Sequence, residues 1–315
     1  MTFPQFVQNP TAINLAGLSA STWTTFASGA PAGATGMAAL IVGNSGTQAR
    51  ELRKTGSSDT FTADTIASSQ QVVRFTGLNG SGQFDYWSAG GNQTSDLIYP
   101  LAYFGPEATF PTNQIIMGST LTTSFVNNYS TGGNAPSAIA AVFAIHGGND
   151  VSCYFRHPSS TDTLQNGNES TARRDWFCAL NGSQQYSAIA GTAGRQPYLV
   201  CYFTSNVVEA NAATHNVVVR TPGTAGSYQN LSSSGDTNPI GTLYYLRSPS
   251  ASEAFQLSGL GTAWSAPNQV PCGTLAGLGL AYTPAQANIA STVLVINELA
   301  YFTAGGVANA LAWIT

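Results

Sequence analysis

Charged side chains are scarce in this chain of 315 residues. Asp, Glu, Lys and Arg together make up 8% of it, against roughly 25% in an ordinary soluble domain. Lys54 is the only lysine, and no charged residue stands before Arg50 or after Glu298. Because surface charge keeps soluble monomers apart, we expect so neutral a chain to cover much of its surface with other subunits. The alternative is a surface of Ser, Thr, Asn and Gln, which water solvates without charge.

The charges that are present argue against nucleic acid as a partner. The net charge is −4 and the ten cations are dispersed, so no basic patch can follow a phosphate backbone. The short basic clusters, around Arg50 and Arg53 and at Arg173 and Arg174, are interpreted as solvated strand ends.

Long apolar runs are missing as well. The strongest run, at residues 37–42, has the length of a strand and falls far below the ~18 apolar residues of a membrane-spanning helix. The N-terminus also lacks the basic and apolar regions of a signal peptide. These features predict a protein that is made in a cytoplasm and does not insert into a membrane.

Helix signals are few. No window shows a sustained period of 3.6 residues, and 33 glycines and 15 prolines interrupt the chain too often for long helices. Short apolar runs rich in Val, Ile, Thr, Tyr and Phe, bounded by turn residues, are typical of strands. The expected fold class is all-β, made of β-sandwiches, with the jelly roll as the favoured form.

One pattern occurs three times along the chain. Three hairpin-like segments place an acid six residues after an arginine: Arg53 to Asp59, Arg156 to Asp162 and Arg247 to Glu253. Each is followed by an apolar run that ends in Tyr-Phe, and the last residues, Phe104, Phe203 and Phe302, are 99 residues apart. A period of this length matches one small all-β domain rather than a solenoid repeat.

The repeat predicts three tandem β-sandwich modules of similar length. Their expected bounds are residues 1–105, 106–207 and 208–315. The last module ends in an uncharged tail, residues 302–315, in which Val307, Leu311 and Trp313 would form an exposed apolar patch. We expect this tail to dock on a neighbouring subunit or on the sheet of the third module.

The repeated hairpin is interpreted as an element of the fold. An arginine that closes the outgoing strand would lie near an acid that opens the return strand, and such a cross-strand ion pair contributes ~0.2–1 kcal/mol. A reactive centre rarely needs to appear three times in one chain. The alternative is a ligand-binding loop.

The four cysteines can be judged against the repeat. Cys201 stands in the position of Ala102 and Ala300, and Cys178 in that of Thr76. No CxxC motif or His/Cys spacing typical of a metal site occurs. We therefore expect packed thiols, with one disulfide inside the second module as the alternative, and we expect no metal or other cofactor.

The first module resembles a module of tailed-bacteriophage structural proteins. The stretches ELRKTGSSDTFTA, VRFTGLNGSGQFDYW and LIYPLAYF are similar to the LRKxGSTD-type hairpin, the GLDxxGxF-type segment and the closing strand of that family. The second module keeps RHPSSTDT and FCALNGSQQY, whereas the third lacks a clear GLNG segment.

The resemblance implies a β-sandwich component of a virion, such as a tail fibre, spike, head fibre or decoration protein. Such a protein is assembled in the host cytoplasm, contacts other virion proteins and can contact the host surface. A homo-oligomer is expected, with a trimer as the first choice, because closed symmetry shields apolar faces.

Catalytic signatures are missing. The histidines are His146, His157 and His215, and no GxSxG, HExxH, GxGxxG or P-loop motif occurs. The expectation is a protein that is not an enzyme. A hydrolase whose residues converge from distant loops is the alternative.

Four residues of the stretch FDYWSAGGNQTSD form the candidate binding site: Asp85, Trp87, Asn92 and Asp96. An exposed tryptophan can stack on a sugar ring while neighbouring carboxylates and amides bind its hydroxyls. In a strand, Trp87 would share a face with Asp85. This pattern predicts a glycan-binding, lectin-like role as the alternative function. The other interpretation is that Trp87 packs under the glycine-rich loop or against another module.

Overall fold

The fold is all-β, as predicted. The computed structural model describes residues 2–43, 48–61, 65–66, 70–91, 96–146, 153–161, 173–209, 217–220, 228–231, 240–247, 255–259, 276–282, 285–289 and 295–302. Within these ranges every regular element is a strand, and all pairs of neighbouring strands are antiparallel. No helix in this part of the chain has the length and hydrophobicity needed to span a membrane.

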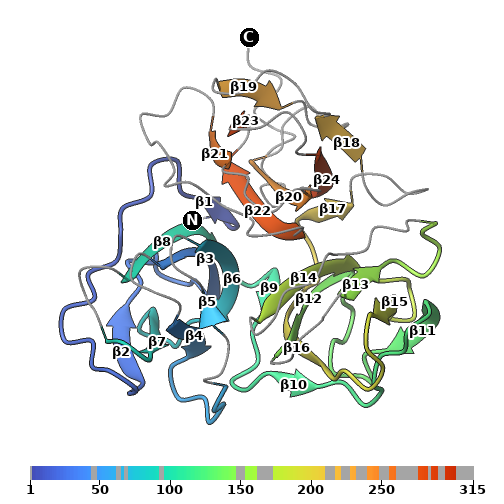
Figure 1. The fold of residues 1–315 in the computed structure, drawn as a ribbon, viewed down its shortest axis with the longest axis horizontal. Helices are drawn as coiled ribbons and strands as arrows, with labels where there is room; N and C mark the ends of the chain where they lie inside the picture. Colours follow the sequence, from blue (N-terminus) through green and yellow to red (C-terminus); the bar gives the residue numbers. More distant parts are fainter. Residues whose placement is uncertain are drawn as a thin grey trace.

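The first sheet pair contains the first eight strands (Figure 1). They are β1 (Gln5–Phe6), β2 (Thr24–Ala27), β3 (Gly36–Gly43), β4 (Gln48–Lys54), β5 (Thr65–Ile66), β6 (Gln70–Gly77), β7 (Gln83–Ser88) and β8 (Asp96–Phe104). One sheet has the order β1-β8-β3-β6 and the other the order β2-β7-β4-β5. This alternation of strands between two sheets is that of a jelly roll.

The second sheet pair repeats this order. Its strands are β9 (Ala108–Thr109), β10 (Ile115–Ile116), β11 (Val126–Ser130), β12 (Ala140–Ile145), β13 (Cys153–Arg156), β14 (Arg174–Ala179), β15 (Gln185–Ala190) and β16 (Pro197–Phe203). One sheet has the order β10-β16-β12-β14, with β9 also paired to β16, and the other has the order β11-β15-β13 in the described residues.

The third sheet pair has the same pattern again. Its strands are β17 (Val207–Glu209), β18 (Val217–Arg220), β19 (Tyr228–Leu231), β20 (Gly241–Arg247), β21 (Phe255–Gly259), β22 (Ala276–Tyr282), β23 (Ala285–Ile289) and β24 (Val295–Phe302). The sheet orders are β17-β24-β20-β22, with β18 also on β24, and β19-β23-β21. The predicted module bounds at residues 105 and 207 stay a prediction, and the C-terminal tail lies outside the described residues.

The three Tyr-Phe ends occupy equivalent positions. Phe104 pairs with Gly36, Phe203 with Ala140 and Phe302 with Gly241. In each closing strand the register then shifts by one residue at the same place, and the residue left out of the pairing is Leu101, Val200 or Leu299. A bulge bends its strand locally and is retained as a feature of a fold. The spacing of 99 residues in the sequence therefore corresponds to a repeated backbone geometry.

The same register tests the cysteine positions. Cys201 lies opposite Val142, as Ala102 lies opposite Ala38, so the predicted equivalence of Cys201 and Ala102 is confirmed. The thiols of Cys153, Cys178 and Cys201 are buried, as expected. Cys272 lies outside the described residues.

Strand β3 is buried on both faces. Met37, Ala39 and Ile41 face the core of the first sheet pair. Ala38 and Leu40 face a second core, which continues through the second sheet pair and includes Leu243 of β20. Strands that are buried on both sides read as continuous apolar runs. The sheet that contains β3 is therefore covered by the neighbouring sheet pairs on the face that points away from its own core.

Three equivalent edge strands meet at the centre of the molecule. Strands β6, β14 and β22 each end the order of their sheet, and each of them contacts the other two. Figure 1 shows the three sheet pairs as lobes around this centre, coloured blue to cyan, green to yellow and orange to red. The arrangement is an approximate three-fold within one chain.

Aromatic rings close two of the three contacts between the lobes. Phe110, which follows β9, packs on Gly36 of the first sheet pair, and Phe6 of β1 packs on Gly241 of the third. A Cβ atom at Gly36 would lie 2.2 Å from the Phe110 ring, and one at Gly241 would lie 2.1 Å from the Phe6 ring. Each glycine thus permits a close approach that any side chain would prevent.

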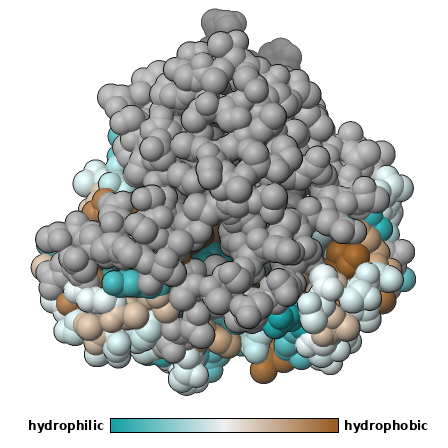
Figure 2. Space-filling view, viewed as in Figure 1, coloured by the Kyte–Doolittle hydropathy of each residue, from teal (hydrophilic) through white to brown (hydrophobic). Residues whose placement is uncertain are grey.

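The described part of the surface mixes hydrophilic and apolar side chains (Figure 2). On the face drawn in Figure 2, the described residues are mostly of intermediate hydropathy, with hydrophilic and hydrophobic residues scattered among them. Large apolar side chains that are exposed include Ile116, Val126, Ile139 and Val208.

Replacement of Gly36 by alanine tests the close contact with Phe110. The new methyl group must displace a buried ring, so we expect a loss of stability of about 1–3 kcal/mol, typical of overpacking. The measurement is thermal unfolding. Gly118→Ala is the matched control, since a Cβ atom there would meet nothing within 4 Å. Equal melting temperatures for the two variants would contradict the packing described.

Candidate functional site

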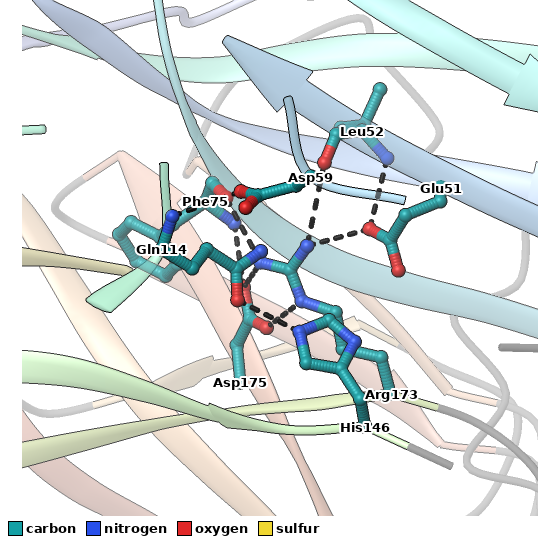
Figure 3. A network of polar contacts seen from close by, with 8 residues as sticks. All are labelled: Glu51, Leu52, Asp59, Phe75, Gln114, His146, Arg173 and Asp175. Atoms are coloured by element: carbon teal, nitrogen blue, oxygen red, sulfur yellow. Dashed lines mark hydrogen bonds and ion pairs between the residues drawn. The ribbon is translucent and has the colours of Figure 1, made fainter. Parts of the chain in front are cut away.

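A buried ionic network joins the first sheet pair to the second (Figure 3). Its centre is Arg173, directly before β14, whose side chain is 0% exposed. Its Nε and Nη2 atoms donate to the two carboxylate oxygens of Asp175, at 2.6 and 2.9 Å. Its Nη1 atom donates to Oε1 of Glu51 in β4, at 2.5 Å. The fork of the guanidinium thus binds one carboxylate with two parallel bonds and a second carboxylate with one.

The side chains of Arg173 and Asp175 also cover the edge of strand β6. The backbone N–H of Phe75 donates to Oδ2 of Asp175 at 2.8 Å, and Nη2 of Arg173 donates to the backbone carbonyl of Phe75 at 3.1 Å. The unpaired backbone groups of an edge strand must find partners when they are buried. Arg173 and Asp175 therefore take the place of a neighbouring strand at this point.

The repeated hairpin of the first sheet pair docks on the second sheet pair beside this network. Nζ of Lys54 donates to the carbonyl of Phe110 at 3.1 Å. The N–H of Ser58 donates to Oδ1 of Asn113 at 2.8 Å, and the N–H of Gln114 donates to Oδ2 of Asp59 at 2.9 Å. Burial lowers the pKa of Lys54. The hairpin is therefore an element of the fold that recognises the segment leading into the next sheet pair.

His146 at the end of β12 completes the network. Its Nε2 atom lies 2.7 Å from Oε1 of Gln114, and its ring stacks on Phe61 with 3.7 Å between centroids and an angle of 8°. Burial, and secondarily the charge of Arg173, lower the pKa of His146 to about 3. The side chain is neutral at physiological pH.

The ion pair predicted between Arg53 and Asp59 is corrected by the structure. Nη1 of Arg53 donates to the backbone carbonyl of Asp59, whereas its ion pair is with Asp85, at 3.2 Å. The reason is register: Asp85 lies directly opposite Arg53 on β7, and the carboxylate of Asp59 is bound to the next sheet pair.

The first two hairpins share a contact between arginine and an aromatic ring. The guanidinium of Arg53 lies 4.1 Å from the ring centroid of Trp23, and that of Arg156 lies 3.7 Å from the ring centroid of Phe125. Such contacts contribute ~0.5–1 kcal/mol at exposed sites. Asp162, Glu253 and the side chain of Arg247 lie outside the described residues.

The glycan candidates are only partly brought together. Asp85 and Trp87 lie on the outer face of β7, opposite Phe84 and Tyr86, which face the core. Asp96 is 1% exposed and bonds to Nε of Arg50 at 2.8 Å in the interior, so its place in a ligand site is a wrong prediction. Asn92 lies outside the described residues.

The carboxylate of Asp85 is already bound within the chain. Its Oδ1 atom accepts hydrogen bonds from Thr25 at 2.8 Å and from Thr55 at 2.9 Å, and its Oδ2 atom pairs with Arg53. A ligand would have to displace one of these donors. Trp87, which is partly buried, is the residue of this face that remains for a ring-stacking contact.

The interpretation of the arginine clusters as solvated strand ends is wrong for Arg50 and Arg173. Both guanidinium groups are fully buried, each paired with a buried carboxylate. The signal that could have revealed Arg173 is the sequence Arg-Arg-Asp joined directly to the apolar run WFCA, in a chain that has so little charge. Its partner Glu51 is 122 positions away along the chain, a pairing that no local pattern reveals.

Comparisons with known proteins assign no family to the chain. No family model matches it, and no curated protein matches it. Among solved structures, the crystal structure of the STIV MCP, a viral major capsid protein, matches over 100% of both chains with 6% identity and a TM-score of 0.20. A likeness at this TM-score carries no argument about this chain.

Replacement of Arg173 by methionine tests the network. Two buried carboxylates would lose their shared cation and Phe75 would lose a donor to its carbonyl, so we expect a loss of about 3–5 kcal/mol in the free energy of unfolding. Denaturant titration measures it. The matched control is Arg53→Met, where a partly exposed pair and a ring contact are removed and the expected loss is about 1 kcal/mol. Similar losses in the two variants would show that the buried network contributes no more to the free energy of unfolding than the partly exposed pair does.

Proposed function

We propose that this protein is a structural component of a bacteriophage particle, located on the head or tail surface or on an appendage, and not an enzyme. The proposal rests on the resemblance of the hairpin, GLNG and closing-strand motifs to virion modules. It rests also on one structural observation, which is where the chain places its few charges.

A set of charged side chains lies inside the molecule. The whole chain has ten basic and 14 acidic residues. Among the residues whose burial the structure describes, eight charged ones are buried: Arg50, Glu51, Arg74, Asp85, Asp96, Glu107, Arg173 and Asp175. These buried groups contribute no charge to the surface. Net surface charge is what keeps isolated proteins apart in solution. A surface poor in charge suits a chain that is surrounded by neighbours in an assembly.

The buried groups also favour a structural role over a catalytic one. Arg173, Asp175 and Glu51 are at most 1% exposed, and their hydrogen bonds join backbone and side chains of two sheet pairs. A catalytic group must reach its substrate. These groups bond to one another and to the backbone of the strands that they join.

The approximate three-fold bears on the expected oligomer. Three equivalent sheet pairs surround β6, β14 and β22 in a single chain. One chain therefore already has the approximate three-fold arrangement that a homotrimer would have. We propose that copies of the chain associate through the outer faces of the sheet pairs, with themselves and with other virion proteins, because the strand edges at the centre are already occupied.

Light scattering coupled to size-exclusion chromatography tests the assembly. We expect species heavier than the 32.7 kDa chain that become more abundant with concentration. Ile116→Glu, which places charge on an exposed apolar side chain, should reduce them, and Gly118→Ala should leave them unchanged. A species of 32.7 kDa at every concentration, together with absence of the chain from purified particles by mass spectrometry, would contradict the proposal.

A glycan-binding role is the second candidate, favoured by the position of Trp87 beside Asp85 on the outer face of β7. Glycan-array binding should be lost in Trp87→Ala and retained in Trp87→Phe, because a phenyl ring still stacks on a sugar. The melting temperature of each variant controls for folding. If Trp87→Ala binds as the unchanged protein does, Trp87 is not the contact.

A further inference from the structure

The contact between the first and second sheet pairs surrounds one neutral histidine. The ring of His146 forms a cluster with Phe61, on which it stacks, and Tyr198, whose ring is edge-on at 5.1 Å between centroids. Its Nε2 atom is held by the Gln114 side chain. Phe61 belongs to the first sheet pair, and the other three residues belong to the second. His146 is partly buried, and the part of its cover that Phe61 provides is present only while the two sheet pairs are together.

The charged groups around His146 come from every element that meets at this contact (Figure 3). Arg173 and Asp175 come from β14 and the residue before it, Glu51 comes from β4, and Arg74 comes from β6; each of them acts on the His146 ring. Asp59 of the hairpin binds the backbone of Gln114. The set contains two guanidinium groups, and the hydrogen bonds of Arg173 already engage Glu51 and Asp175.

A proton on His146 would therefore place a third cation in a confined site. Desolvation is the largest penalty on a charged imidazole. Arg173 and Arg74 repel it, and Glu51 and Asp175 attract it. Separation of the two sheet pairs removes Phe61, Arg74 and Glu51, so more water reaches the ring, while Arg173 stays in the sheet pair of His146.

We propose that the contact between the first and second sheet pairs is an acid-sensitive joint, which opens when His146 takes up a proton. The inference concerns this chain alone and does not depend on its place in a virus particle.

The direction follows from proton linkage. In the closed arrangement the pKa of His146 is about 3, and in an open one it returns towards 6.5. Above pH 6.5 neither arrangement binds the proton, so the closed contact has its full stability. Between pH 6.5 and 3 only the open arrangement binds it, so stability of the contact is lost as the pH falls through this window. Linkage predicts an opening constant that rises on the order of tenfold between pH 7 and pH 5.

Hydrogen exchange measured by mass spectrometry on the full chain tests the joint. The peptides to follow cover β6 and residues 53–61, at pH 7 and pH 5, after correction for the intrinsic exchange rate. The unchanged protein should show exchange at pH 5 that is on the order of tenfold faster in these peptides, and little change in β7. His146→Gln, which cannot titrate but can still donate to Gln114, should show no such increase.

His157→Gln is the matched control. His157 lies in the second hairpin, its pKa is also lowered by burial, and its ring bonds locally to Ser159. This variant should keep the acid response of the unchanged protein. His146→Asn serves the same purpose as His146→Gln if the latter does not fold. Equal protection of β6 at pH 7 and pH 5 in the unchanged protein, or an acid response in His146→Gln as steep as in the unchanged protein, would overturn the proposal.

Discussion

Edge strands that meet inside a protein must have their backbone groups paired, and this requirement shapes the centre of the molecule. Strands β6, β14 and β22 end their sheets at the point where the three lobes meet. At Phe75 the pairing comes from the side chains of Arg173 and Asp175. A buried ion pair is expensive to desolvate unless its remaining donors and acceptors are satisfied. The backbone of β6 helps to satisfy them, so the edge and the ion pair stabilise each other.

The same requirement explains why a chain with so little charge places much of it inside. An apolar partner could fill the space beside β6, but it could not accept from the N–H of Phe75 or donate to its carbonyl. Glu51 then provides the second carboxylate that the Arg173 guanidinium binds, and this bond joins β4 to the same network. The described charges that are buried in this way are lost to the surface, and a surface poor in charge is what the proposed role in an assembly requires.

Much of the fold could be predicted from local pattern. Short apolar runs and turn residues predict strands, because a strand depends on residues that are close in sequence. The 99-residue spacing of Phe104, Phe203 and Phe302 predicts their equivalent pairing, because the pairing follows the repeat. The contacts between sheet pairs could not be predicted in this way. Whether Arg53 pairs with Asp59 or with Asp85 depends on strand register, and the burial of Arg173 depends on how two sheet pairs pack, which sequence spacing does not encode.

The repeat is also not uniform where the lobes touch. Gly36 and Gly241 receive the rings of Phe110 and Phe6, whereas the equivalent position of the second sheet pair is Ala140. A methyl group excludes an equally close ring, so the three contacts are not interchangeable. Such differences are expected when one chain holds three copies, because each contact surface needs to fit only one particular partner.

The central claim is that three jelly-roll sheet pairs close around β6, β14 and β22 within a single chain. A crystal or cryo-electron microscopy structure of the full protein tests it most directly. The account predicts that successive rotations of about one third of a turn superpose the three closing strands, each with its bulge before the Tyr-Phe end. It predicts also that Asp175 lies against the backbone of Phe75. A structure in which the sheet pairs are strung out without mutual contact of these strands would contradict it.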